Sequence, residues 1–221
     1  MPGGGRDRLD AQNRVSRFIA LLLAAAAFCF AGGGAQALDY EFYRQGRETA
    51  VLVTGEFQYG DEKRFRREIQ NAKPVSEVIF ASPGGNVYAA LAIGRFLREI
   101  GLPTRVNRGQ ACASACVYAL IGGIFRTVEP GARVGVHMSS ITGNKELLRD
   151  VTEVIRRQGP AGAKEVLSLI EQSAASVMAA QARYLVDMSV SMELMHPITD
   201  TQSDEMHWLS RRELERYNIV N

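Results

Sequence analysis

The sequence predicts an α/β protein built around a mostly parallel sheet. Short apolar segments such as 77–81 and 133–137 alternate with stretches of about 10 to 15 residues at helical spacing, which is typical of βαβ units. The composition, 46% hydrophobic and 23% charged over 221 residues, is average for soluble globular proteins. It excludes disorder, collagen-like repeats and coiled coil. No repeat or linker divides the chain, so one domain is expected after the N-terminal segment.

Residue type, spacing and turn signals predict each element in turn. Asn86 caps a helix whose apolar residues recur at helical spacing, and Gly101 ends it. Gly159-Pro160 breaks a long helical region. The predicted elements are a hairpin of 40–43 and 49–54, a helix over 61–71, a strand over 77–81, a helix over 87–100, a strand over 103–106, a tight turn and buried helix over 109–119, strands over 124–128 and 133–137, the helical region 145–187, a short helix through 217, and a small strand over 218–220.

Residues 1–37 have the features of a cleaved signal peptide. An arginine-bearing start is followed by the apolar stretch 18–31 and then by Ala35-Gln36-Ala37, which fits the small-x-small pattern of signal peptidase. The stretch is shorter than the roughly 20 residues that span a bilayer, so cleavage after Ala37 is favoured over a retained anchor. The mature protein of about 184 residues, 38–221, is then periplasmic or secreted.

The location of the charges argues against a nucleic-acid partner. The whole chain has a formal charge of +2, but residues 1–37 hold four arginines and two aspartates. The remainder therefore carries 22 basic and 22 acidic side chains. A neutral domain lacks the basic surface that nucleic-acid binding requires.

The turn Gly109-Gln-Ala-Cys-Ala-Ser-Ala-Cys116 carries the candidate nucleophile, Ser114, at a helix start among small residues. A serine nucleophile needs a base, an oxyanion hole and access. The Ala115 N–H can face developing negative charge at the helix start. Gly84 or Gly85 can supply a second donor, because a residue without Cβ lets its amide approach the substrate. Each motif alone is also explained as a helix cap or a turn.

Three histidines limit the choice of base. His137 ends the predicted strand 133–137, at the edge of the sheet where the active sites of such folds gather. His196 lies beside a proline in an expected loop, and His207 precedes Trp208 near the C-terminus. A lone histidine at a strand end is usually structural. The proximity expected to Ser114 makes His137 the candidate.

Four ordered motifs resemble the Clp protease proteolytic subunit (ClpP) and the wider ClpP/crotonase superfamily. They are Ser82-Pro-Gly-Gly85, Gly109-Gln-Ala-x-Ala-Ser114, the strand into His137, and Trp208-Leu-Ser-x-x-Glu-x-x-x-Tyr-x-Ile-Val, spread over roughly 51–220. The spacing of 23 residues from Ser114 to His137 is close to that family's pattern.

The resemblance implies a ClpP/crotonase-like fold of repeated ββα units over 38–221. It implies a serine endopeptidase, a hydrolase that needs no cofactor, with Ser114 as nucleophile and His137 as general base. Gly85 and Ala115 would form the oxyanion hole, and a peptide or protein would be the substrate. The leader separates this chain from the ATP-driven cytoplasmic protease. An ATP-independent enzyme without an ATPase partner is therefore expected.

The third member of the triad is open. ClpP places an aspartate shortly before the segment that matches Trp208, and counting back lands at Gln202, between Asp200 and Asp204. Asp187 lies 50 residues after His137, as in ClpP, but in the expected long helix. The order of preference is Asp200, Asp204, Asp187. A backbone carbonyl can also orient the base.

A Ser-Lys dyad, as in signal-peptide peptidases of the same superfamily, is the rival chemistry. It is disfavoured because every lysine falls in an expected exposed helix or turn: Lys63, Lys73, Lys145 and Lys164.

Cys112 and Cys116 flank Ser114 and are the only cysteines outside the leader. In an oxidising compartment they can pair, and the position of Cys112 before the helix relaxes the poor geometry of a pair within one helix. Two buried thiols explain them equally well. No metal site is expected, because the two cysteines have no nearby histidine or carboxylate.

A catalytically inactive ClpP-fold module that binds a peptide or a partner protein is the alternative function. Acyl-CoA chemistry of the crotonase type is disfavoured, because CoA is not expected outside the cytoplasm. The resemblance also implies a homo-oligomer, with 145–187 where ClpP has its handle. One helix face there fits self-association or core equally: Ala174, Ala175, Val177, Met178, Ala179 and Ala182.

Overall fold

The computed structural model describes residues 37–45, 48–72, 74–140 and 145–221. Residues 1–36 of the predicted leader lie outside this set, so the leader stays a prediction. The described residues divide into two compact units, 145–168 and 37–140 with 169–221. The second unit contains the sheet and all the candidate site residues. Among the described residues, no helix has the length and apolarity needed to cross a bilayer.

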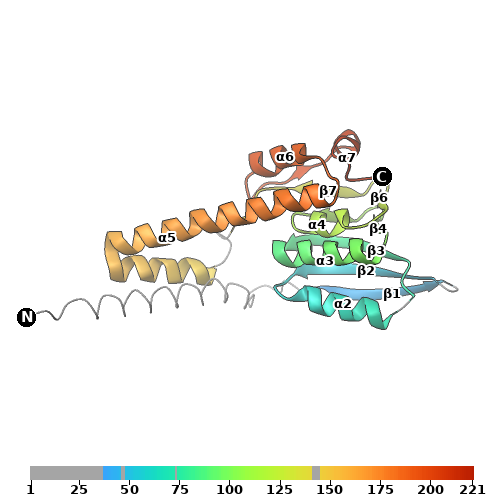
Figure 1. The fold of residues 1–221 in the computed structure, drawn as a ribbon, viewed down its shortest axis with the longest axis horizontal. Helices are drawn as coiled ribbons and strands as arrows, with labels where there is room; N and C mark the ends of the chain where they lie inside the picture. The colour runs from blue at the N-terminus through green and yellow to red at the C-terminus, as the bar shows by residue number, and fades with distance from the viewer. Residues whose placement is uncertain (1–36, 46–47, 73, 141–144) are drawn as a thin grey trace, which may run out of the picture. The chain divides into compact units, whose positions relative to one another are not determined.

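The described residues form one sheet of eight strands that branches after β3 (Figure 1). The main path is β1-β2-β3-β5-β7-β8, and β4 pairs with β3 and β6. Pairing is parallel except between β1 and β2 and between β7 and β8, so the predicted mostly parallel sheet is confirmed. The strands are β1 (Asp39–Gln45), β2 (Glu48–Phe57), β3 (Glu77–Gly85), β4 (Thr104–Val106), β5 (Ala111–Ala113), β6 (Arg126–Val128), β7 (Arg133–Val136) and β8 (His207–Trp208).

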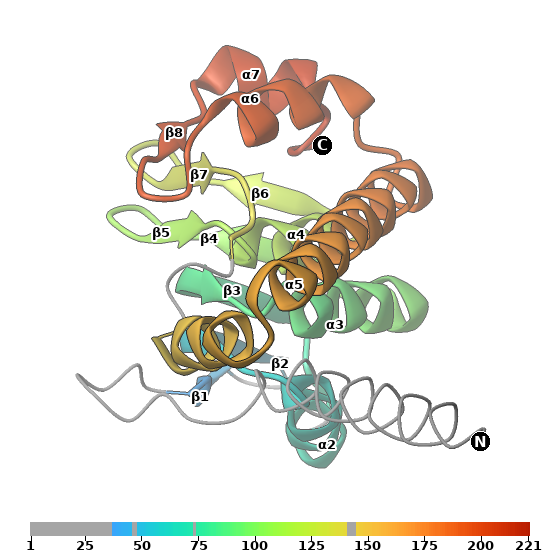
Figure 2. The ribbon, with the colours of Figure 1, turned by 90° about the vertical axis from the view of Figure 1, so that its left-hand side faces the viewer.

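Three helices of the second unit, α2, α3 and α4, lie on the same face of the sheet (Figures 1 and 2). The long helix α5 has non-helical backbone angles at Gly159, directly before Pro160, as its sequence predicts. The helices are α2 (Asp61–Asn71), α3 (Val87–Ile100), α4 (Cys116–Ile121), α5 (Lys145–Asp187), the 3₁₀ turn η1 (Met192–Leu194), α6 (Met195–Asp200) and α7 (Arg211–Arg216).

Both ends of α3 form as its sequence predicts. The Asn86 side chain accepts a hydrogen bond from the Ala89 N–H at 2.9 Å, which satisfies one of the unpaired amides of the first turn. Gly101 ends the helix at φ 70°, a left-handed conformation that glycine adopts without strain. The α3 helix therefore starts directly after the Asn86 cap, and Gly84 and Gly85 are the last two residues of β3, at its carboxyl end.

Helices α3 and α4 pack backbone against backbone. A Cβ added to Gly122, at the end of α4, would lie 2.3 Å from the Gly94 Cα of α3. The Tyr184 hydroxyl of α5 donates to the Tyr118 carbonyl at 2.7 Å and fills the space that a Gly94 Cβ would need. Tyr118 and Tyr184 both belong to the hydrophobic core. Glycine at positions 94 and 122 is thus what allows the close approach.

A buried arginine joins the C-terminal ends of two helices. Arg126 of β6 is 2% exposed, and its Nη1 donates to the carbonyls of Ile121 at 3.2 Å and Met188 at 3.1 Å. These carbonyls belong to the negative ends of α4 and α5. Burial, followed by repulsion from Arg98, lowers the pKa of Arg126 to about 10, so the guanidinium remains charged at neutral pH.

Three local predictions were wrong. His196 lies in α6 and not in a loop. Residues 218–220 are not a strand, because Asn218 has φ 55° and the Ile219 N–H donates back to the Leu214 carbonyl at 2.8 Å, which closes the end of α7. The turn before α4 is preceded by a short strand, β5, that its small residues do not signal.

Candidate active site

Ser114 lies in the turn between β5 and α4 with a backbone φ of 55°. A non-glycine residue in this left-handed region carries a steric cost of about 1–2 kcal/mol, so its surroundings must hold it there. One of the constraints is its own amide, which donates to the Gly135 carbonyl of β7 at 2.8 Å. The chain reverses from strand to helix at this residue, and its side chain is partly exposed.

Gly84 lies directly against Ser114. A Cβ built on Gly84 would come within 2.7 Å of the Ser114 Cβ and 3.0 Å of the Ala115 nitrogen. The Gly84 N–H itself donates to the Ser82 hydroxyl at 3.1 Å, so Gly84 contributes space and not a donor. Within the described residues the Ala115 N–H has no hydrogen-bond acceptor, and it lies beside this space. Ala115 and Gly85 remain the predicted oxyanion donors.

A disulfide joins Cys112 of β5 to Cys116, the first residue of α4, with 5.3 Å between the two Cα atoms. Both cysteines are buried. The sequence left this pairing open, and the structure contains it. Ser114 is the central residue of the closed segment, so the bridge links the strand that leads to Ser114 and the helix that follows it.

His137 follows β7, the strand next to β5. The two strands run parallel with Ala113 opposite Gly135, so Ser114 and His137 leave the sheet at neighbouring points of the same edge. The His137 Nδ1 lies 2.9 Å from the Met138 carbonyl oxygen. A carbonyl only accepts, so in the neutral ring Nδ1 carries the proton and Nε2 is left as the base. No hydrogen bond joins His137 to Ser114 in the part of the chain that the structure describes.

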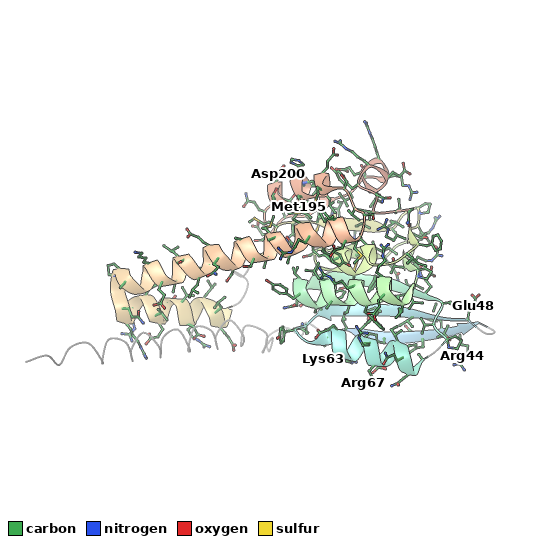
Figure 3. The ribbon with its side chains drawn as sticks, viewed as in Figure 1. Arg44, Glu48, Lys63, Arg67, Met195 and Asp200 are labelled. Carbon is green, nitrogen blue, oxygen red and sulfur yellow. A yellow bond between two sulfur atoms is a disulfide. The ribbon has the colours of Figure 1, made fainter. Side chains whose placement is uncertain are left out.

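The structure joins none of the three candidate aspartates to His137. Asp200 is exposed at the end of α6 (Figure 3), and Asp204 is exposed in the loop after it. Neither forms a hydrogen bond or ion pair with the described residues. Asp187 pairs with Arg95 at 3.4 Å. What lies next to His137 is backbone: the Met138 N–H donates to the Thr201 carbonyl at 3.0 Å.

The other candidate bases are occupied or exposed. The His207 Nε2 lies 2.8 Å from Glu213 Oε1, and the hydrogen bond from the Ser210 hydroxyl, with that of His207, lowers the pKa of Glu213 to about 2. His196 is exposed on α6. Lys63 is exposed on α2 and points away from the sheet (Figure 3), and Lys164 is exposed on α5. Lys73 and the Lys145 side chain lie outside the described residues.

One neighbour of the site, Gln181, carried no sequence signal. Gln181 of α5 is 1% exposed, and its Nε2 donates to the Ser139 hydroxyl at 2.9 Å, two residues beyond His137. Gln181 lies among small apolar residues of a long helix, so its burial cannot be inferred from the sequence.

A cavity of about 780 Å³ lies elsewhere, between β6, the β6–β7 turn and α7, and shares no residue with this site. The described residues contain no cluster of three or more metal-ligating side chains.

Comparison with known proteins supports the fold. No protein-family model and no curated protein matches the chain. Among solved structures, a ClpP1 mutant from Listeria monocytogenes matches with a TM-score of 0.51 and 20% sequence identity, over 78% of this chain and 88% of that chain. The branched, mostly parallel sheet with its helices on one face agrees with this match. The chain therefore has a ClpP/crotonase-like fold.

Proposed function

We propose that this protein is an ATP-independent serine peptidase of the periplasm or the secreted fraction, with Ser114 as nucleophile and His137 as general base. The observation that carries the proposal is the backbone of Ser114. A serine in the left-handed conformation between a strand and a helix presents its hydroxyl at the edge of the sheet, as nucleophilic serines do in other α/β hydrolases. Residues held in such strained conformations cluster at active sites.

The proposed reaction uses the groups that converge at this edge. Ser114 Oγ attacks the carbonyl carbon of a peptide bond while His137 Nε2 takes the hydroxyl proton. The Ala115 and Gly85 amides bind the oxyanion of the tetrahedral intermediate. His137 then gives its proton to the leaving amine, and a water molecule activated by the same ring hydrolyses the acyl-enzyme.

Two features support export. The leader over 1–37 has the order of a signal peptide. The Cys112–Cys116 disulfide is typical of an oxidising compartment, because cytosolic thiols are kept reduced. ATP-driven unfolding is not expected there, so the substrate would be a peptide or an unfolded protein. A homo-oligomer is part of the proposal, since a ClpP-like fold suggests assembly.

A binding module without catalysis is the second candidate. The observation in its favour is that no described carboxylate contacts His137 and no hydrogen bond joins it to Ser114. The same backbone of Gly84, Gly85 and Ala115 at the edge of the sheet would then bind a peptide without cleaving it.

Labelling with a fluorophosphonate probe tests the proposal. The wild type and the control Ser168→Ala, which changes an exposed serine of α5, should be labelled, whereas Ser114→Ala should not. His137→Gln should slow labelling by roughly 100-fold or more, because the hydroxyl loses its base. A folded wild type that resists the probe but binds peptides, with Ser114→Ala binding equally well, would favour the binding module. Labelling that persists in Ser114→Ala would exclude Ser114 as the nucleophile.

A further inference from the structure

A histidine that acts as general base needs a neighbouring group that orients its ring. In a serine-histidine-aspartate triad the carboxylate accepts the Nδ1 proton and so fixes the tautomer that leaves Nε2 basic. In this protein the acceptor within reach of Nδ1 is the Met138 carbonyl, at 2.9 Å. A peptide carbonyl performs the same orienting task without a charge, provided that its direction is fixed.

The Met138 carbonyl is fixed from both sides. It belongs to the planar peptide between Met138 and Ser139, so anchors on these two residues set its direction. On one side the Met138 N–H donates to the Thr201 carbonyl at 3.0 Å. On the other side the Ser139 hydroxyl accepts a hydrogen bond from Gln181 Nε2 at 2.9 Å. The first anchor is backbone and the second is a side chain that substitution can remove.

Gln181 is unusual for a helix residue with a merely structural role. It is 1% exposed, and its Oε1 is buried without a hydrogen-bond partner among the described residues. Burying a glutamine with half of its amide unsatisfied is unfavourable, and an apolar residue of similar size would pack there at lower cost. Among the described residues, the Gln181 side chain makes one hydrogen bond, to Ser139, next to the orienting carbonyl.

We propose that the Met138 carbonyl orients His137 in place of a carboxylate, and that Gln181 is a positioning residue that holds this carbonyl through Ser139. The catalytic importance of this arrangement rests on the proposed peptidase function. The orientation of His137 by the Met138 carbonyl can be tested without that function. On this proposal, Asp200, Asp204 and Asp187 are not needed to fix the tautomer.

The tautomer of His137 can be measured directly. Nitrogen-15-labelled histidine in the folded full-length protein gives separate signals for its three histidines, and His137→Gln assigns the relevant one. At mildly alkaline pH, where histidine rings are neutral, wild-type His137 should show the proton on Nδ1. Gln181→Met, which keeps side-chain volume but not the donor, and Ser139→Ala should both give a mixture of tautomers. Gln172→Ala, an exposed glutamine of the same helix, is the matched control and should match the wild type.

Fluorophosphonate labelling separates this inference from the proposed function. Gln181→Met and Ser139→Ala should each slow labelling roughly 10- to 100-fold, and the double variant should be no slower than either single variant, since both remove one contact. A wild-type His137 protonated on Nε2, or variants with an unchanged tautomer, would overturn the positioning role. If Asp200→Asn or Asp204→Asn changed the tautomer of His137, that carboxylate and not the Met138 carbonyl would be the orienting group. If the tautomers behave as expected but nothing is labelled, the positioning holds and the peptidase proposal fails.

Discussion

Replacing Gly84 by alanine is the most specific test of the site's construction. The new methyl group would lie 2.7 Å from the Ser114 Cβ, 2.8 Å from the Ala113 carbonyl oxygen and 3.0 Å from the Ala115 nitrogen. Real Cβ atoms do not approach backbone so closely, so the serine turn must shift. The backbone φ of +114° adds strain for any residue with a Cβ.

The expected magnitude comes from these two contributions. The conformational strain is about 1–2 kcal/mol and the overpacking about 1–3 kcal/mol. The matched control is Gly60→Ala, because Gly60 has φ +87° but nothing within 4 Å of a built Cβ. Gly60→Ala should lower the free energy of unfolding by the strain alone, and Gly84→Ala by about 1–3 kcal/mol more.

Urea unfolding of both variants, followed by circular dichroism, measures this difference. At a urea concentration where both variants are folded, fluorophosphonate labelling should be slowed only in Gly84→Ala, because a displacement of about 1 Å at the nucleophile costs roughly 100-fold in rate. Equal stability of the two variants, or unchanged labelling of Gly84→Ala, would refute the claim that Gly84 provides the space in which Ser114 is held.

Three further predictions concern the disulfide, the buried arginine and an acidic side chain. The double variant Cys112→Ala/Cys116→Ala should lose about 2 kcal/mol in unfolding free energy, as expected for a short loop, and should be labelled more slowly. An unchanged labelling rate would show that the disulfide does not hold the Ser114 turn in place. Arg126→Met should lose about 1–3 kcal/mol, because the Met188 carbonyl loses this donor and the Ile121 carbonyl keeps only the one from Arg98, and a thermal melt that matches the wild type would contradict this. The pKa of Glu213 is lowered from 4.5 to about 2, so its ionised form stabilises the fold above the ordinary value and this stabilisation is lost as the pH falls toward 2. Unfolding midpoints of the wild type should therefore fall between pH 4.5 and 2 more steeply than those of Glu213→Gln, and parallel curves would argue against it.

Elements with strong local signals were predictable from the sequence. Asn86, Gly101 and Gly159 each act within their own helix, so their effect is readable without the fold. Elements that form only because other chain segments pack or pair with them were not predictable from the sequence. The β5 strand has three small residues and forms because β3 and β7 pair with it on either side. Asn218 caps α7 in the left-handed conformation, although the residues after it have a strand-like composition.

The candidate site shows the same division. Ser114 and His137 could be selected because a turn of small residues and a strand end are local patterns. The group at His137 Nδ1 could not, because a backbone carbonyl has no sequence signature and every residue carries one. Gln181 lies 44 residues beyond His137, and only the packing of α5 brings it to Ser139.

The backbone contact of α3 with α4 has a consequence for the two segments that form the candidate site. The end of β3, with Gly84 and Gly85, leads into α3, and the Ser114 turn leads into α4, so each helix follows one half of the candidate site. Between Gly94 and Gly122 no side chain can change rotamer to absorb an altered spacing. The separation of the two segments is therefore constrained at a contact more than a helical turn away from Ser114. In a saturation-mutagenesis library sorted for labelled protein, positions 94 and 122 should retain glycine alone, although neither residue belongs to the proposed catalytic groups.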